Sequence, residues 1–127
     1  MTDAEYDKLK AEIKEKVRFY KDLMGLGLWI ITCDYSREIC EDCPQRGAYT
    51  TAFWAYRDAK ITFYLPLLAE STKSLDSAII HELSHLLVAP MDGSSSDSEM
   101  EFAVDSVALA IERAAGINRV EERKDNE

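Results

Sequence analysis

The sequence predicts an α+β fold: an N-terminal helix, a small antiparallel sheet with a hairpin, and then two packed helices. Apolar residues recur every three or four positions near both ends of the chain, and β-branched and aromatic residues fill its middle. Turn-forming residues separate these segments. At 127 residues the chain is long enough for one domain, 1–127, and the charged segment 119–127 is expected to be a flexible tail.

The first element is a helix over residues 2–24. Thr2 followed by Glu5 has the spacing of a capping box. Gly25 is well placed to end the helix. One apolar stripe follows its whole length: Tyr6, Leu9, Ile13, Val17, Tyr20 and Met24.

The middle of the chain predicts strands. Residues 26–35 fit a strand, and the polar segment 36–47, which contains proline and glycine, fits a loop. The segments 48–57 and 60–65 predict two strands of an antiparallel hairpin joined at "RDAK". Pro66 ends the second strand, and a short helical turn over 67–72 follows.

Two helices are expected after this sheet, over 74–89 and about 99–115. Pro90 ends the first, Ser96 or Ser98 caps the second, and Gly116 stops it. The apolar stripes are Leu75, Ile79, Leu83, Leu86 and Leu87 in the first helix, and Met100, Val104, Val107, Ile111 and Ala114 in the second.

The first of these helices contains "HELSH", with both histidines of the chain, His81 and His85, four positions apart. Residues at this spacing lie on one helix face, so two imidazoles can converge on one zinc ion. Glu82 projects from an adjacent part of the helix and can act as a base towards water. A buried helix is an expensive place for these three polar groups unless something satisfies them, which favours a metal site over a chance match.

A catalytic zinc also needs a third protein ligand. The downstream candidates are Asp92, Asp97, Glu99, Glu101, Asp105 and Glu112. Glu101 and Asp105 lie one turn apart on a stripe beside the apolar one, so one could bind the ion while the other accepts the N–H of a ligand histidine. Glu99 cannot face the same ion as Glu101, because two helical positions differ by about 200°.

"HELSH" followed by "EFAVD" resembles the gluzincin metallopeptidases, which carry HExxH, a loop, and a second helix with Glu-x-x-x-Asp. The small size resembles the single-domain minigluzincins and small phage-type proteins. The resemblance, strongest over 78–109, implies a zincin-like domain in which His81, His85 and Glu101 bind one Zn²⁺, Glu82 is the catalytic base and Asp105 holds His81. The large C-terminal domain of thermolysin-like enzymes has no counterpart here. Peptide deformylases also carry HExxH, but their glycine-rich segment is not visible around "CEDC".

Composition limits the partners. The net charge of −9 disfavours nucleic acid, and the sequence has no apolar run of membrane-spanning length. The charged N-terminus is unlike a signal peptide, so a cytoplasmic protein with reduced thiols is expected. Cys40 and Cys43 then form a reduced loop pair, or alternatively serve a metal or redox role.

The expected function is a zinc peptidase that acts on a peptide or protein substrate. In the gluzincins a sheet-edge strand aligns the substrate, and "KITFYL", 60–65, is the candidate for this role. The main alternative is a metal-binding regulatory or phage accessory protein without peptidase activity. A purely structural helical module must treat "HELSH" and "EFAVD" as coincidence together.

Overall fold

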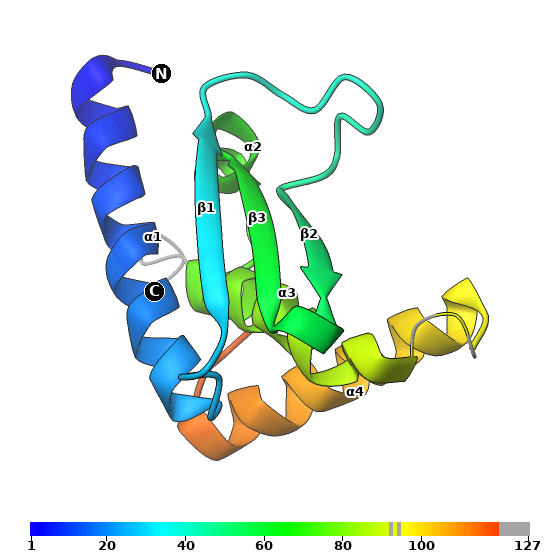
Figure 1. Ribbon diagram of the computed structural model, residues 1–127. Coiled ribbons are helices and arrows are strands. Elements are labelled where there is room, and N and C mark those ends of the chain that lie inside the picture. The colour runs from blue at the N-terminus through cyan, green and yellow to red at the C-terminus, as the bar shows by residue number, and fades with distance from the viewer. Residues whose placement is uncertain (92, 94, 120–127) are drawn as a thin grey trace.

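The computed structural model describes residues 1–91, 93 and 95–119. Asp92, one of the candidate ligands, and residues 120–127 of the expected tail lie outside the described residues. Figure 1 shows a mixed α and β arrangement, in which α1 lies beside a small sheet while α3 and α4 follow at the end of the chain. The predicted fold class, with an N-terminal helix, a small sheet and packed helices, is confirmed.

The N-terminal helix α1 spans Asp3–Leu23 and begins with the predicted capping box of Thr2 and Glu5. Ile13, Val17 and Tyr20 are buried on its inner face. The Tyr20 hydroxyl donates to Asp76 Oδ2 at 2.5 Å, and Lys16 Nζ lies 2.9 Å from Asp76 Oδ1. α1 is therefore fastened to the first turn of the helix that carries the predicted site.

The sheet has three strands, β1 (Ile30–Ser36), β2 (Ala48–Phe53) and β3 (Asp58–Tyr64), in the order β1-β3-β2. The predicted antiparallel hairpin exists between β2 and β3, with Thr50 opposite Ile61. It turns earlier than expected, through the 3₁₀ helix η1 (Trp54–Tyr56) and Arg57 in the left-handed region at φ 49°.

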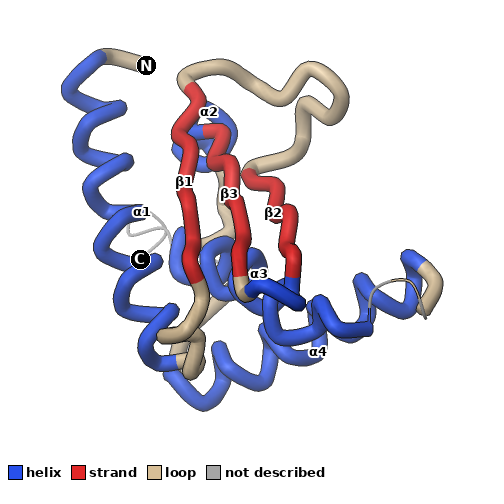
Figure 2. The backbone as a smooth tube through the Cα atoms, viewed as in Figure 1, coloured by secondary structure: helices blue, strands red, loops and turns tan. Residues whose placement is uncertain are grey.

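The expectation of an entirely antiparallel sheet is wrong, because β1 pairs with β3 in parallel. The cause is the loop 37–47, which carries the chain from β1 past the end of β3 before β2 begins (Figure 2). β2 therefore runs back on the far side, and β3 fills the space between the other two strands. "KITFYL" is consequently in the central strand and not at an edge, which corrects its predicted role in aligning a substrate.

Helix α2 (Leu65–Glu70) has Pro66 in its first turn and leads into α3 (Leu75–Val88), where the Ser74 hydroxyl accepts from the Ser77 N–H. α3 is apolar towards the sheet, where Ile79, Leu83 and Leu86 join Ile61 and Phe63 in the core. Leu87 was expected in this stripe, yet it is exposed. It lies one position after Leu86, so it turns away from the face that packs.

Helix α4 (Asp97–Ala115) follows the 3₁₀ helix η2 (Ala89–Met91) and packs on α3. It begins at Ser96 with a second capping box and ends at Gly116, as predicted. Its predicted apolar stripe is only partly right, because the buried residues are Val104, Ala108 and Glu112. The packed face is thus rotated towards the polar stripe that contains Glu112.

Candidate metal centre

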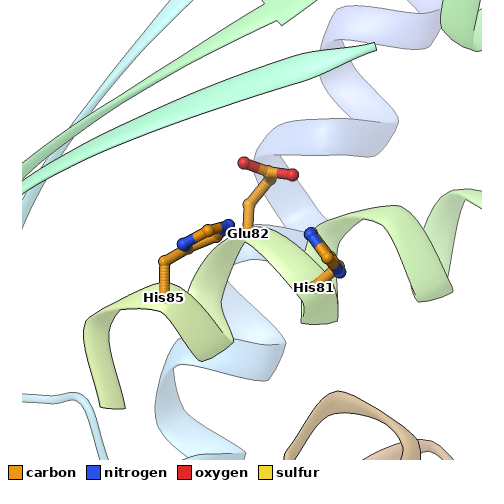
Figure 3. A group of neighbouring side chains, drawn as sticks. All are labelled: His81, Glu82 and His85. Atoms are coloured by element: carbon orange, nitrogen blue, oxygen red, sulfur yellow. The ribbon is translucent and has the colours of Figure 1, made fainter. Parts of the chain in front are cut away.

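Helix α3 brings His81, Glu82 and His85 together (Figure 3). Their possible ligand atoms, one from each residue, all lie within 4.8 Å of one another. The two imidazole rings are 5.2 Å apart between centroids, as expected for residues one helical turn apart. The histidines are half-buried and the glutamate is buried, so the group lies at the surface end of the core and not in open solvent.

His81 has the form of imidazole that a metal requires. Burial lowers its pKa to about 4, and the positive charge of Lys73 acts in the same direction. At neutral pH the ring is therefore uncharged and keeps a lone pair for a ligand bond. Its Nδ1 atom is buried and has no hydrogen-bond partner among the described residues. Such an orphaned polar atom is costly unless a further group satisfies it.

Glu82 is 8% exposed and points away from α3 between the two imidazoles (Figure 3). Burial raises its pKa, while a hydrogen bond from the Thr50 hydroxyl to Oε1, 2.8 Å long, opposes the rise. A carboxyl whose pKa is raised above its usual value takes up a proton more readily than an ordinary glutamate and can return it. Thr50 lies in β2, so the sheet positions the proposed base while α3 carries it.

The donor set fits a zinc ion. Two imidazoles at one-turn spacing, an orphaned ring nitrogen and a nearby carboxylate are the groups that Zn²⁺ binds in proteins. The same three residues could also place Glu82 on the ion directly, because its carboxylate belongs to the group. The zinc content of a Glu82→Gln variant separates these two arrangements.

Glu101 and Asp105 belong to α4, which packs on α3, but neither belongs to the close group. The negative charge of Glu101 raises the pKa of Glu82, and that of Asp105 raises the pKa of His81. Both carboxylates therefore face the site electrostatically, although both residues are exposed. Asp105 Oδ1 pairs with the Arg119 guanidinium at 2.9 Å, and His81 Nδ1 does not donate the expected hydrogen bond to Asp105. The roles of Glu101 as a zinc ligand and of Asp105 as the residue that holds His81 stay predictions.

Two other candidate ligands have different roles in the structure. Glu99 completes the capping box of α4 by accepting from the Ser96 N–H at 2.9 Å. Glu112 is buried, accepts from the Ser77 hydroxyl and pairs with Arg119 Nε at 2.8 Å. Both side chains are thus engaged at the ends of α4, away from the pair of histidines. Asp97 lies in the first turn of the same helix.

The loop between β1 and β2 contains two cysteines that form no disulfide, and one of them lies near the site. Cys40 and Cys43 are free thiols, and Cys40 is buried. Hydrogen bonding from the backbone of Cys43 lowers the pKa of Cys40. Cys43 lines a hollow of about 360 Å³ beside His81 and Glu82. Neither thiol belongs to the metal-binding group found among the described residues.

Comparison with protein-family models, with curated proteins and with solved structures finds no match to this chain. The resemblance to gluzincins therefore rests on the HExxH group, whose three side chains the structure places close together. Among the described residues, no helix is long and apolar enough to cross a membrane.

Sequence reasoning missed Thr50 and the hollow beside the site. A signal for Thr50 was available, because it alternates with Ala48 and Ala52 on the inward side of the strand, where a lone hydroxyl needs a partner. The residues that line the hollow come from the loop 37–47, the first residue of β2, α2, the segment 71–74 and the middle of α3. No local pattern connects segments so distant in the sequence.

Proposed function

We propose that this chain is a zinc-dependent peptidase of the gluzincin type. The observation that supports the proposal most strongly is the gathering of His81, Glu82 and His85 on one buried helix. One Zn²⁺ per chain would be held by the two histidines and Glu101, with Asp105 turned towards His81. When bound, this ion would supply the positive charge that polarises a scissile carbonyl and acidifies water.

The chain's own groups would move the proton. Glu82 would take it from the attacking water and later pass it to the leaving amine. The Thr50 hydroxyl donates a hydrogen bond to Oε1 of this carboxylate. Oε2 accepts no hydrogen bond from the described residues. Oε2 is therefore the oxygen that would carry the proton. His81 and His85 would keep Glu82 between them, and His81, whose pKa burial lowers to about 4, would stay neutral at neutral pH.

Strand β2 is the candidate for aligning a peptide substrate. It lies at the edge of the sheet next to α3, and Thr50 connects it to Glu82. An extended peptide can add to such an edge through backbone hydrogen bonds. β3 cannot serve, because its two neighbours β1 and β2 already pair with it.

The test is digestion of a peptide library by zinc-loaded protein, compared with the Glu82→Gln variant. Loss of one general base typically lowers a rate by about 10²–10⁴-fold, and we expect a loss of this size with zinc retained. Wild-type protein that binds zinc but cuts no peptide would instead support the alternative of a metal-binding protein without peptidase activity. Cleavage that persists in Glu82→Gln would contradict the role of Glu82.

A further inference from the structure

A hollow of about 360 Å³ opens beside His81 and Glu82. One wall is apolar and consists of Leu67 and Leu68 of α2, and Gly47 closes the side towards β2. The Gly47 position is tight, because an added Cβ would lie 2.9 Å from Leu68 Cδ2. The hollow is thus a shaped space that adjoins the proposed base and one proposed ligand.

Two cationic side chains, Arg46 and Lys73, line this hollow. Neither makes an ion pair within the part of the chain that the structure describes, whereas Arg119 and Lys16 do. The Arg46 guanidinium lies over the Tyr49 ring, 4.6 Å from its centroid, which fixes its place without neutralising it. Both cations therefore have no carboxylate partner among the described residues, and both line the same hollow.

The charge of Lys73 reaches the proposed catalytic groups. It lowers the pKa of both His81 and Glu82. The carboxylate that lines the hollow is Glu82 itself, which is buried and held by Thr50. The hollow is therefore lined by two positive charges, and the one carboxylate among its lining residues is already engaged by Thr50. An apolar wall with a convergent positive charge suits an anionic group on a ligand.

We infer that Arg46 and Lys73 form an anion subsite that selects peptide substrates with a carboxylate close to the scissile bond. This inference rests on the proposed peptidase function and names its substrate class. The carboxylate could belong to an aspartate or glutamate side chain, or to the C-terminus of a short peptide. Both present the same chemistry to the guanidinium and the ammonium group.

The first test measures binding to metal-free protein, so that it does not depend on hydrolysis. Three hexapeptides of one sequence are titrated by calorimetry: one with a central glutamate and an amidated C-terminus, one with glutamine and an amidated C-terminus, and one with glutamine and a free C-terminus. We expect a carboxylate-bearing peptide to bind on the order of 10-fold more tightly than the neutral one, as for a partly exposed charge pair near the upper end of its range. The peptide that gains affinity identifies the source of the carboxylate.

Variants then assign the effect to the subsite. Lys73→Gln and Arg46→Gln should each reduce the preference for the carboxylate peptide, and Lys73→Glu should reverse it in favour of a lysine peptide. Lys8→Gln is the matched control, because Lys8 is exposed on α1 and does not line the hollow. The preference should also shrink as salt is raised. Equal affinity of wild-type protein for all three peptides would overturn the inference, as would an unchanged preference in both Lys73→Gln and Arg46→Gln.

Hydrolysis gives a second measurement whose failure is distinct. With zinc-loaded protein, the ratio of kcat/KM for the acidic peptide over the neutral peptide should fall on the order of 10-fold in Lys73→Gln and stay as in wild type in Lys8→Gln. A loss of the same factor for both peptides would overturn the inference, because Lys73 would then act on the reacting carbonyl and not on a substrate anion. If no peptide is hydrolysed, the proposed function fails while the binding measurement still decides the subsite.

Discussion

Two buried glutamates, Glu82 of α3 and Glu112 of α4, are held in opposite ways. Glu112 is 1% exposed, accepts from the Ser77 hydroxyl and pairs with the Arg119 guanidinium. Glu82 is 8% exposed, and its hydrogen bond comes from the neutral hydroxyl of Thr50. The first carboxylate is compensated by a cation inside the fold, whereas the second has a raised pKa and adjoins an open hollow.

This difference suggests a structural role for Glu112 and a chemical role for Glu82. A buried carboxylate with a cation partner stabilises the position of that partner and has no capacity left for a ligand. A buried carboxylate with a neutral partner keeps a free lone pair and has a raised pKa, both of which favour proton transfer. The Glu112 end of the helix pair is therefore expected to control folding, and the Glu82 end metal binding and hydrolysis.

The largest expected effect tests whether α4 supplies a ligand to the Glu82 end. Glu101→Ala should remove nearly all zinc affinity, because it deletes a ligand. Asp105→Ala should weaken binding by about 10–100-fold, as is typical for a group that orients a ligand. Glu99→Ala should leave zinc affinity close to that of the wild type, since Glu99 is engaged in the cap of α4. Competitive zinc titration of the three folded variants measures the ranking, and a ranking led by Glu99 would break the gluzincin resemblance.

The next effect concerns the Glu112 end. Arg119→Met keeps most of the side-chain stem but leaves the Glu112 carboxylate buried without its cation. The free energy of unfolding should fall by about 3 kcal/mol, the lower end of the range for breaking a buried pair by removing one partner. Urea denaturation at neutral pH measures this change, and Arg119→Met with Glu112→Gln should recover part of it.

Glu82→Gln supplies the matched comparison, because Glu82 has no cation partner to strand. Its unfolding free energy should stay within about 1 kcal/mol of the wild-type value, in contrast to Arg119→Met. A loss of 3 kcal/mol in both variants would show that the two glutamates do not differ in the way proposed.

A smaller effect is expected at Thr50. Thr50→Val removes the hydroxyl that donates to Glu82 at 2.8 Å and should cost about 1–3 kcal/mol of unfolding free energy, as for a buried acceptor left unsatisfied. Since this hydrogen bond opposes the rise in the pKa of Glu82, its loss should also move the acidic limb of the pH–rate profile to higher pH. Thr51→Val is the control, because Thr51 is exposed on the other face of β2. An unmoved acidic limb would show that Thr50 does not tune Glu82.

The last prediction concerns the pH dependence of the metal-free protein. Burial lowers the pKa of His81 from about 6.5 to about 4, so the unfolded chain binds a proton before the folded chain does. The contribution of His81 to stability is therefore complete above pH 6.5 and is lost as pH falls from 6.5 towards 4. We measure the unfolding free energy of wild type and of His81→Gln across this range. The wild-type value minus the variant value should decrease as the pH falls from 6.5 towards 4. A difference that grows at low pH would contradict the sign.

Much of the site was predictable because its information is local. The spacing of His81 and His85 on a helix, and the capping boxes at Thr2 and Ser96, depend on residues four positions apart or fewer. The helices were therefore predicted to within a few residues. The order of the strands was not, because the pairing of β1 with β3 depends on how the loop 37–47 crosses the sheet.

The same limit explains the roles that sequence reasoning could not assign. Glu112 was one of six acidic candidates, and its partners Ser77 and Arg119 lie 35 positions before it and 7 after it. Nothing in the local pattern distinguishes a carboxylate that has a cation partner from one that has none. The structure makes that distinction, and it removes Glu112 from the candidates for metal binding.

The most direct test of the account is the zinc content of the protein at pH 7.5. It is measured by elemental analysis after incubation with a small excess of zinc and dialysis to remove the unbound ion. The account predicts one zinc per chain in the wild type and in Glu82→Gln, and none in His81→Ala. Two zinc ions per chain would indicate a second site, with Cys40 and Cys43 as its ligands. A wild-type protein that retains no zinc, or a Glu82→Gln variant that loses it as fully as His81→Ala, would contradict the claim that two histidines hold the ion while Glu82 acts as the base.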